Sequence, residues 1–250
     1  MDLLKLIIDY HKDAERQGPG SVEATKKALR YLPKLNQESS ILDIGCGTGA
    51  QTIVLAENTN ANIIAIDMLQ PFLDQLKSKI KDKEYANRID IQCLSMDKMN
   101  FPEKSFDVIW SEGAIYNIGF EKGLSLWKKY IKNDGYIVIS EISWLTATRP
   151  KEIENYWLNA YSEIDTIENK LATLERCGYL PITHFVLGDY EWIENYYKPM
   201  IDRSEAFLKK YNYAKEVRDF IDAGIDEADM YQQYKQYYSY VFYITKKSKE

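Results

Sequence analysis

A turn built from three alternate glycines carries the strongest chemical signal in this sequence. An apolar, strand-like run leads into it and a helix-like run follows; the segment reads Leu42, Asp43, Ile44, Gly45, Cys46, Gly47, Thr48, Gly49. Glycine lets the main chain turn sharply and lets a ligand approach without meeting a Cβ atom. Residues 45–49 are therefore expected to cradle a ligand, and a tight strand-to-helix connection is the alternative.

Two carboxylates fall where the next two strand-like runs end. Asp67 ends the run at residues 63–66, where an acidic side chain can accept two hydrogen bonds from a ribose diol. Asp97 follows the run at residues 89–93; there a carboxylate can accept from an adenine amino group, and Met96 can pack on the purine. A solvated strand end and an exposed turn cap are the alternatives. With the glycines, the two carboxylates predict one nucleoside site across three consecutive strand ends.

These residues, together with the FDVIWSE run at residues 106–112, resemble the class I S-adenosylmethionine-dependent methyltransferases. The likeness is to bacterial small-molecule members similar to the ubiquinone/menaquinone-biosynthesis type, and it covers about residues 40–145. It implies that the glycines hold the amino-acid part of S-adenosylmethionine, that Asp67 holds the ribose and Asp97 the adenine, and that S-adenosylhomocysteine is the product. The residues expected to contact the cofactor are Gly20, Ser21, Asp43, Gly45, Cys46, Gly47, Gly49, Asp67, Met68, Met96, Asp97, Ser111 and Glu112.

Methyl transfer from a sulfonium is an in-line displacement, so the protein must mainly align the acceptor with the methyl group and exclude water. A hydroxyl, amine or acidic-carbon acceptor would also gain from one general base. The run SEGAIYN at residues 111–117 carries polar groups into the expected crevice. Glu112 is a candidate base or partner of the cofactor ammonium, and Tyr116 a candidate to orient the acceptor. The alternatives are a Glu112 that accepts from backbone amides and a Tyr116 that only packs.

The turn at residues 18–21 combines two glycines with a proline and with Ser21, which can cap the helix that follows. A helix N-terminus offers free N–H groups and a partial positive charge that suit a carboxylate or another anion. The residues before it would then form a lid over the cofactor. An ordinary helix cap is the alternative.

Five other side chains have weaker claims to a chemical role. Glu141, Ser143 and Trp144 end the fifth strand, where they line the same cavity or form a packed strand end. His11 is expected to be a surface histidine and His184 a structural one. Two histidines with no metal-binding spacing give few ligands for a transition metal, so no metal is assigned.

Strands and helices alternate from about residue 40 to residue 188. Strands are expected at residues 41–44, 62–66, 89–93, 106–110, 135–142, 182–187 and 237–245. Helices are expected at residues 51–57, 70–81, 121–130 and 164–177. This order predicts a doubly wound α/β fold with a seven-stranded, mostly parallel sheet, whose ligands bind beyond the carboxyl ends of the strands. The last strand is expected to close the sheet antiparallel to the one around His184.

The chain is expected to form a single methyltransferase domain over residues 1–250. Residues 1–38 would be a helical cap, with helices at residues 3–15 and after Ser21, and residues 39–145 the cofactor-binding core. Residues 146–250 would hold helical insertions and the closing strands; an aromatic segment includes Tyr156, Trp157 and Tyr161, and a helical stretch at residues 191–236 breaks near Lys198-Pro199 and Gly224.

Composition limits the remaining choices. The charged fraction is 28% and no apolar run approaches the roughly 20 residues that span a bilayer, so a soluble protein without a membrane partner is expected. Three separated cysteines suit reduced thiols in a cytoplasm. A net charge of −6 disfavours a nucleic-acid partner. The 20 tyrosines mostly suit packing, although such a face could also bind a flat or cationic acceptor or form a homodimer.

The expected activity is therefore that of an S-adenosylmethionine-dependent methyltransferase (EC 2.1.1.-) acting on a small molecule. A protein or RNA acceptor is one alternative, and it would require an exposed groove. An NAD-dependent oxidoreductase is disfavoured, because the glycines follow GxGxG rather than GxGxxG spacing and no pair for hydride chemistry is evident. A non-catalytic cofactor-binding module that regulates a partner is the last alternative.

Overall fold

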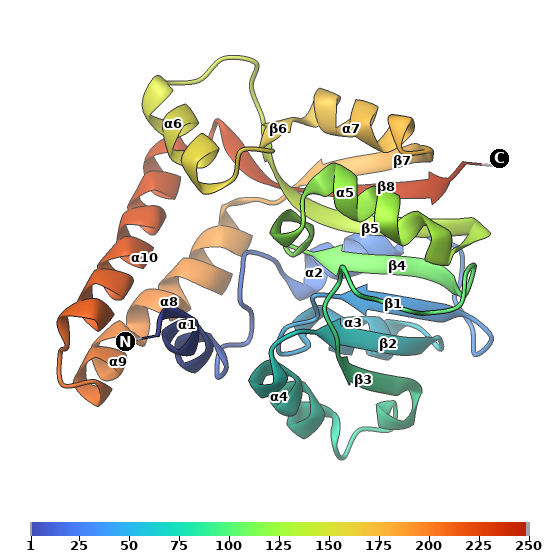
Figure 1. The fold of residues 1–250 in the computed structure, drawn as a ribbon, viewed down its shortest axis with the longest axis horizontal. Helices are drawn as coiled ribbons and strands as arrows, with labels where there is room; N and C mark the ends of the chain where they lie inside the picture. Colours follow the sequence, from blue (N-terminus) through green and yellow to red (C-terminus); the bar gives the residue numbers. More distant parts are fainter. Residues whose placement is uncertain (1, 249–250) are drawn as a thin grey trace.

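A mixed sheet organises the part of the chain that the structure, a computed structural model, describes, which is residues 2–248 (Figure 1). Its strands are β1 (Ser40–Ile44), β2 (Asn62–Asp67), β3 (Ile89–Cys93), β4 (Phe106–Glu112), β5 (Ile131–Trp144), β6 (Asp165–Thr166), β7 (Tyr179–Val186) and β8 (Tyr238–Lys247). Seven strands follow the order β3-β2-β1-β4-β5-β8-β7, and the short β6 pairs with the end of β5. This order places β1 and β4 at the centre, where a crossover reverses direction and ligands bind in open α/β sheets.

The pairing confirms the predicted mostly parallel sheet with an antiparallel last strand. Strands β1 to β5 pair in parallel, whereas β8 runs antiparallel to both β5 and β7. His184 on β7 lies opposite Tyr243 on β8, as expected for the strand around His184. The prediction of seven strands missed β6, a two-residue strand where a helix was expected to begin. So short a strand carries no alternation that a sequence pattern could reveal.

Alternate side chains of the central strands pack on opposite faces of the sheet. Ile41 joins one core cluster with residues of α2 and α3, whereas its neighbour Leu42 joins another with residues of α5 and α7. The covering helices are α2 (Val22–Leu29), α3 (Ala50–Asn58), α4 (Gln70–Ile80), α5 (Phe120–Trp127) and α7 (Ile167–Arg176). Short 3₁₀ turns are η1 (Ala86–Arg88), η2 (Ile115–Asn117) and η3 (Lys128–Tyr130). Because both faces are covered, only the strand ends are left to bind a ligand.

A further layer of helices lies beyond the carboxyl ends of the parallel strands, at the left of Figure 1. It contains α1 (Leu3–His11), α6 (Lys151–Ala160), the π-helical η4 (Tyr190–Tyr197), α8 (Lys198–Asp202), α9 (Ser204–Lys210) and α10 (Lys215–Tyr234). The ring of Tyr10 packs edge-on against Phe207 and Phe220, with ring centroids 4.8 and 5.4 Å apart. Segments from the two ends of the chain thus share one layer. None of the helices within residues 2–248 is long and apolar enough to cross a membrane.

Three helix boundaries differ from those expected. Helix α1 ends at His11 rather than residue 15, and the chain that follows is irregular. Helix α10 passes through Gly224 without a break, because Met200 packs against this glycine, its sulfur 3.4 Å from the place of an added Cβ atom. The helical stretch breaks instead at Asn212 and Tyr213, which have φ angles of 50° and 55°. At Lys198-Pro199 the chain stays helical and changes from π to α geometry.

Most tyrosines of the C-terminal third are packing residues. Tyr231 stacks on Trp192 with ring centroids 4.4 Å apart, and Tyr238 meets both rings edge-on. Tyr190 and Tyr213 remain exposed. The aromatic pattern therefore builds the interface between the C-terminal helices and the sheet.

A buried ion pair joins α7 to β5. The Nζ atom of Lys170 lies 3.2 Å from Oε1 of Glu141, and the two side chains are 3% and 0% exposed. The ammonium also lies 4.3 Å from the ring centroid of Phe120. Burial raises the pKa of Glu141, and the charge of Lys170 opposes that rise. Removing one partner would leave the other as an uncompensated buried charge.

Replacing Lys170 by Met should therefore lower the free energy of unfolding by about 3–5 kcal/mol. The double variant Lys170→Met/Glu141→Gln should regain much of that loss, because no charge is left to desolvate. Urea denaturation measures both. Lys215→Met, which removes an exposed pair with Asp219, is the matched control and should cost less than about 1 kcal/mol. Equal stability of Lys170→Met and this control would contradict the interpretation.

Candidate active site

The glycine-rich turn leaves the carboxyl end of β1 with its glycines in the left-handed region. Gly45, Gly47 and Gly49 have φ angles of 72°, 55° and 87°, which residues with a Cβ atom rarely adopt. The amide of Gly45 donates to the carbonyl of Ile66 at 2.9 Å and ties the turn to β2. A Cβ atom on Gly45 would lie 2.4 Å from that of Ala114. The sheet edge therefore presents bare main chain, followed at once by α3.

Asp67 lies at the end of β2 and spans from that strand to the glycine turn. Its Oδ2 atom accepts from the amide of Gly47 at 3.0 Å, and its Oδ1 atom accepts from the amide of Leu69 at 2.9 Å. Burial raises the pKa of Asp67, and the amides of Leu69 and Gly47 counteract this. Each oxygen retains capacity for a second hydrogen bond, which a ligand hydroxyl could supply.

Asp43 is fully buried beneath the turn. Its Oδ1 atom accepts from Nε2 of Gln51 at 3.1 Å, and its Oδ2 atom accepts from Oγ1 of Thr52 at 2.5 Å. Burial raises the pKa of Asp43 to about 7, even though the bonds from Thr52 and Gln51 lower it. Both donors lie on α3, so Asp43 anchors the start of that helix under the turn. A direct contact with the cofactor stays a prediction.

Three further residues expected to contact the cofactor follow β2 and β3: Met68, and Met96 and Asp97, which were expected at the adenine. Met96 places its Cε atom 3.6 Å from the position of an added Cβ atom on Gly45. Met68 is 66% exposed, so its side chain is free to cover a ligand. Asp97 is exposed and accepts from Oγ of Ser95 at 2.5 Å; this bond lowers its pKa. All three follow strands that end at the same edge as the glycine turn.

Ser111 and Cys46 are buried residues that fix the strand ends. The hydroxyl of Ser111 donates to the carbonyl of Ile44 at 3.0 Å and ties β4 to β1. Cys46 packs in a cluster with Ala65 and Leu73, and burial raises the pKa of its thiol. Both hold the site in shape, and a contact with the cofactor stays a prediction for each.

A segment of the N-terminal region lies directly on the glycine turn. The sequence led us to expect a lid formed by this segment, but it did not reveal the contact made by Gln17. Gln17 accepts from the amide of Thr48 at 3.1 Å through Oε1 and donates to Oγ1 of Thr48 at 3.1 Å through Nε2. Oγ1 of Thr48 in turn donates to the carbonyl of Ala14 at 3.2 Å. Lys79 of α4 donates to Oγ1 of Thr48 at 3.0 Å. The only sequence signal was the proximity of Gln17 to the glycine–proline turn at residues 18–20.

Glu112 ends β4 with its carboxylate surrounded by side-chain donors. Oε1 accepts from Oγ1 of Thr25 at 2.7 Å and from Nε1 of Trp110 at 2.9 Å, and Oε2 accepts from Nη1 of Arg16 at 3.1 Å. The Arg16 and Glu112 side chains are 11% and 5% exposed. These contacts hold the N-terminal segment against β4. They differ from the backbone-amide contacts considered from the sequence, and the roles of base or ammonium partner stay predictions.

Ser21 caps α2, as the sequence predicted. Its hydroxyl accepts from the amide of Ala24 at 3.0 Å and donates to Oε1 of Glu191 at 2.9 Å. Asn195 donates to the carbonyl of Gly20 at 2.8 Å. The turn before α2 is thus joined to η4. A contact of Gly20 or Ser21 with the cofactor stays a prediction.

The end of β5 is a packed strand end in the structure. Ser143 is buried and shares a 2.8 Å hydrogen bond with the hydroxyl of Tyr243. Trp144 is 3% exposed and packs edge-on against Tyr238. Glu141 is buried in the ion pair described above. These contacts favour the packing alternative for the three residues.

The expectation of a surface histidine at position 11 is wrong. Nδ1 of His11 is buried and has no hydrogen-bond partner within residues 2–248. Burial lowers the pKa of His11 to about 4, with a smaller contribution from the charge of Arg203. The cause is the C-terminal helices, which cover α1 and which no local pattern around His11 could reveal. His184 is an exposed residue of β7, with its ring 6.4 Å from that of Tyr243.

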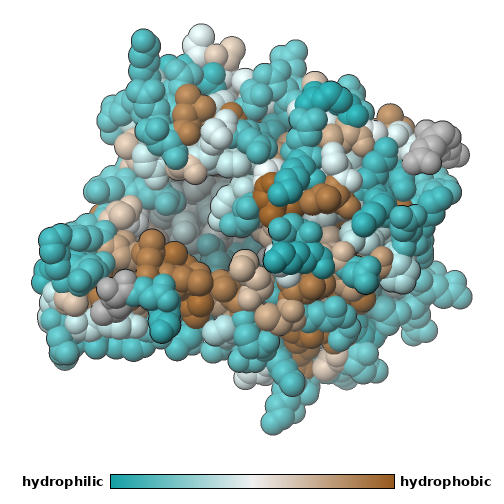
Figure 2. Space-filling view, viewed as in Figure 1, coloured by the Kyte–Doolittle hydropathy of each residue, from teal (hydrophilic) through white to brown (hydrophobic). Residues whose placement is uncertain are grey.

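A hollow opens between the C-terminal helices and the carboxyl ends of β4 and β5, near the centre of the face in Figure 2. Tyr116 follows β4 and is 42% exposed, with its ring 6.0 Å from that of Tyr161. Burial nonetheless raises the pKa of Tyr116. Partial exposure together with desolvation is expected of a side chain that lines a hollow, where it can contact an acceptor.

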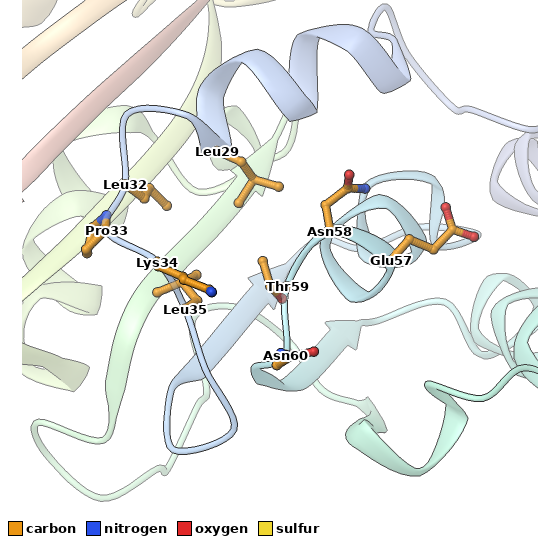
Figure 3. A pocket seen from close by; sticks show the side chains of 9 residues that line it. All are labelled: Leu29, Leu32, Pro33, Lys34, Leu35, Glu57, Asn58, Thr59 and Asn60. Carbon is orange, nitrogen blue, oxygen red and sulfur yellow. The ribbon is translucent and has the colours of Figure 1, made fainter.

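A second hollow, of about 290 Å³, lies at the opposite edge of the sheet (Figure 3). Its lining comes from the ends of α2 and α3 and the turns that follow them: Leu29, Leu32, Pro33, Lys34, Leu35, Glu57, Asn58, Thr59 and Asn60. These turns lead into the amino ends of β1 and β2. The hollow is therefore separated from the glycine turn by the length of the strands.

The strand order and the bare turn at the end of β1 define a Rossmann-like fold. A family model described as a methyltransferase domain matches residues 41–135. A SAM-dependent methyltransferase from Geobacter sulfurreducens, solved in complex with S-adenosyl-L-homocysteine, superposes with a TM-score of 0.82 at 19% identity and covers 98% of each chain. That likeness shows the fold.

Two curated relatives add similarity in sequence. A phosphoethanolamine N-methyltransferase from Plasmodium falciparum is 27% identical over 205 residues, which cover 78% of this chain and 74% of the relative. A ubiquinone/menaquinone biosynthesis C-methyltransferase from Citrifermentans bemidjiense is 31% identical over 150 residues, 59% of this chain and 63% of the relative. Residues 41–135 thus match a methyltransferase domain, and the chain is similar in sequence and in fold to S-adenosylmethionine-dependent methyltransferases.

Replacing Gly47 by Ala should weaken binding of S-adenosylhomocysteine by at least about tenfold. The φ of 55° is unfavourable for alanine, and the new Cβ atom would stand 2.4 Å from Oε1 of Gln17. Calorimetric titration measures the affinity. Gly18→Ala is the matched control, because nothing lies within 4 Å of the added atom. An unchanged affinity of the Gly47 variant would count against the turn as the binding surface.

The raised pKa of Asp43 predicts a pH-dependent stability. Its folded pKa of about 7 exceeds the ordinary value of 3.8, so the folded protein holds this proton more tightly than the unfolded chain. The resulting stabilisation is complete below about pH 4 and is lost as the pH rises through 7, by up to about 4 kcal/mol. Thermal denaturation from pH 4 to 8 should therefore show a decline that is smaller in Asp43→Asn. Parallel curves for the two proteins would refute the assignment.

Proposed function

We propose that this protein transfers the methyl group of S-adenosylmethionine to a small-molecule acceptor bound in the hollow beside β4. The observation that carries the proposal is the bare glycine turn bonded to Asp67, at the sheet edge where the hollow opens. The helical layer from both ends of the chain borders this edge. A site enclosed in this way suits a metabolite better than a protein or RNA chain.

The chain's own residues fit the cofactor. The main chain of Gly45, Gly47 and Gly49 would hold its amino-acid part, Asp67 its ribose and Asp97 its adenine. Bound there, S-adenosylmethionine supplies an electrophilic methyl group on a sulfonium. The N-terminal segment, fixed on the turn by Gln17, would exclude water.

Residues that follow β4 would orient the acceptor. Because burial raises its pKa, the hydroxyl of Tyr116 stays protonated at neutral pH and can donate a hydrogen bond to an acceptor. Glu112 would act as a base only after Arg16 and Thr25 release its carboxylate. We therefore propose alignment by Tyr116 as the main contribution of this segment, with Glu112 holding the N-terminal segment closed.

The names of the relatives support a small acceptor. One is named as a phosphoethanolamine N-methyltransferase and the other as a C-methyltransferase of ubiquinone/menaquinone biosynthesis. The net charge of −6 also disfavours a nucleic-acid acceptor. A cytoplasmic location is proposed from the three free cysteines. A homodimer is proposed from the sequence alone, and Tyr190 and Tyr213 are exposed residues that it could use.

The test has two steps. Calorimetry should show binding of S-adenosylmethionine and S-adenosylhomocysteine by the wild type, and binding weakened at least about tenfold in Asp67→Ala. A metabolite extract incubated with protein and cofactor should then contain a small molecule heavier by one CH₂ group. Tight NAD binding without cofactor binding would overturn the proposal. If the labelled methyl group is found only in the protein or RNA fraction, the acceptor is a macromolecule and not a small molecule.

A further inference from the structure

Glu227, near the middle of α10, is a carboxylate without a cationic partner. Its Oε1 atom accepts from the hydroxyl of Tyr197 at 3.0 Å. None of the ion pairs found within residues 2–248 includes it. Burial raises the pKa of Glu227, and the bond from Tyr197 lowers it. A carboxylate in such surroundings is costly unless a cation or a proton compensates its charge.

Six tyrosines from four elements lie within reach of the charge of this carboxylate, and one of them, Tyr197, contacts it. Burial is the main cause of the raised pKa of each of these tyrosines, and the negative charge of Glu227 raises it further. The six are Tyr116, Tyr156, Tyr196, Tyr197, Tyr238 and Tyr240. They come from η2, α6, η4 and β8. Ring contacts place several of them in one region: the rings of Tyr196 and Tyr197 are 5.1 Å apart, and those of Tyr156 and Tyr238 both pack edge-on against Trp157.

That place adjoins the end of β4, where the acceptor is expected. Cε1 of Tyr240 lies 3.6 Å from the position of an added Cβ atom on Gly113, the residue after Glu112. The hydroxyls of Tyr196 and Tyr240 make no hydrogen bond to another residue among 2–248. Unbonded hydroxyls and ring faces beside a hollow are typical of a ligand-binding surface.

Within residues 2–248, none of the basic side chains near these tyrosines pairs with Glu227 or contributes to its pKa shift. Lys170 pairs with Glu141, and Arg16 pairs with Glu112. Arg203 lies over the ring of Tyr10, 4.6 Å from its centroid, and its Nη1 donates to the carbonyl of Pro199. Its Nε and Nη2 atoms are buried without a hydrogen-bond partner in the described part of the chain, and its charge acts on Tyr196 but not on Glu227. The protein therefore brings no counter-ion of its own to Glu227.

The π-helix η4 positions two of these tyrosines. Its eight residues include Tyr196 and Tyr197, and stretches of π-helix are rare and frequent at functional sites. Asn195 and Glu191 of the same element bond to the turn before α2. The element thus connects the N-terminal segment with the tyrosines around Glu227.

We propose that the hollow binds its acceptor through a positively charged nitrogen, held between the carboxylate of Glu227 and the ring faces of the surrounding tyrosines. The acceptor is then a small aliphatic ammonium compound, protonated or quaternary, whose charged nitrogen is only the group that is recognised. Such a nitrogen has no lone pair, so the methyl group is transferred to another nucleophilic atom of the same molecule, and S-adenosylhomocysteine leaves. Carboxylates and tyrosine rings both attract such cations, most strongly where water is excluded. This inference rests on the proposed function, since it names the substrate class of the same site.

Choline and its uncharged isostere 3,3-dimethylbutan-1-ol provide the test, because they differ in charge and hardly in shape. Each is titrated calorimetrically into protein loaded with S-adenosylhomocysteine. The wild type should bind choline at least about tenfold more tightly than the isostere. Glu227→Gln should abolish this preference. Asp229→Asn, which removes an exposed charge from the same helix, should leave it unchanged.

The outcomes separate this inference from the proposed function. Binding of S-adenosylhomocysteine to the wild type is measured first. If the wild type does not bind it, the proposed cofactor site is wrong, and this result does not depend on the cation site. Equal affinity of the wild type for choline and the isostere overturns the cation site. So does a Glu227→Gln variant that keeps the preference while binding the cofactor normally. If the Glu227→Gln variant does not fold, the cation site is tested by the wild-type comparison and by a Glu227→Asp variant. The Glu227→Asp variant is expected to keep a preference for choline.

Discussion

The site depends on a stretch of main chain that lacks Cβ atoms where β1 ends. Left-handed φ angles at Gly45, Gly47 and Gly49 turn the chain sharply and expose its amides at the sheet edge. One of these amides bonds to Asp67, which brings the end of β2 into the same surface. The amide of Thr48 receives Gln17, so the N-terminal segment also docks there. Three parts of the chain are thus positioned by one backbone conformation.

The elements that build this surface could be predicted because each leaves a local trace in the sequence. The alternation of apolar runs with turn residues located the strands, and β3 was placed at its observed limits. The glycines and the carboxylate of Asp67 sit at strand ends, so their positions followed once the strands were assigned. The cap of α2 by Ser21 was likewise a short-range pattern.

Contacts between distant segments could not be predicted in this way. Arg16 and Thr25 contact Glu112 although they are 96 and 87 positions away from it in the sequence. The residues next to each of the three give no indication of these contacts. His11 was misplaced for the same reason, since the helices that bury it lie at the other end of the chain. Nothing in the sequence around Glu227 distinguishes it from the other acidic residues of its helix, and only the structure shows its contact with Tyr197. Its environment is a tertiary property, which periodicity does not encode.

The position of β8 has a consequence for how the protein is made. This strand lies between β5 and β7, so β7 has no partner in the sheet until residues 238–247 have left the ribosome. Before that moment the nascent chain can assemble β1 to β5 but must leave the edge of β5 open to solvent. Exposed strand edges promote aggregation, so the nascent chain is expected to be most prone to aggregate in the interval before β8 emerges and completes the sheet.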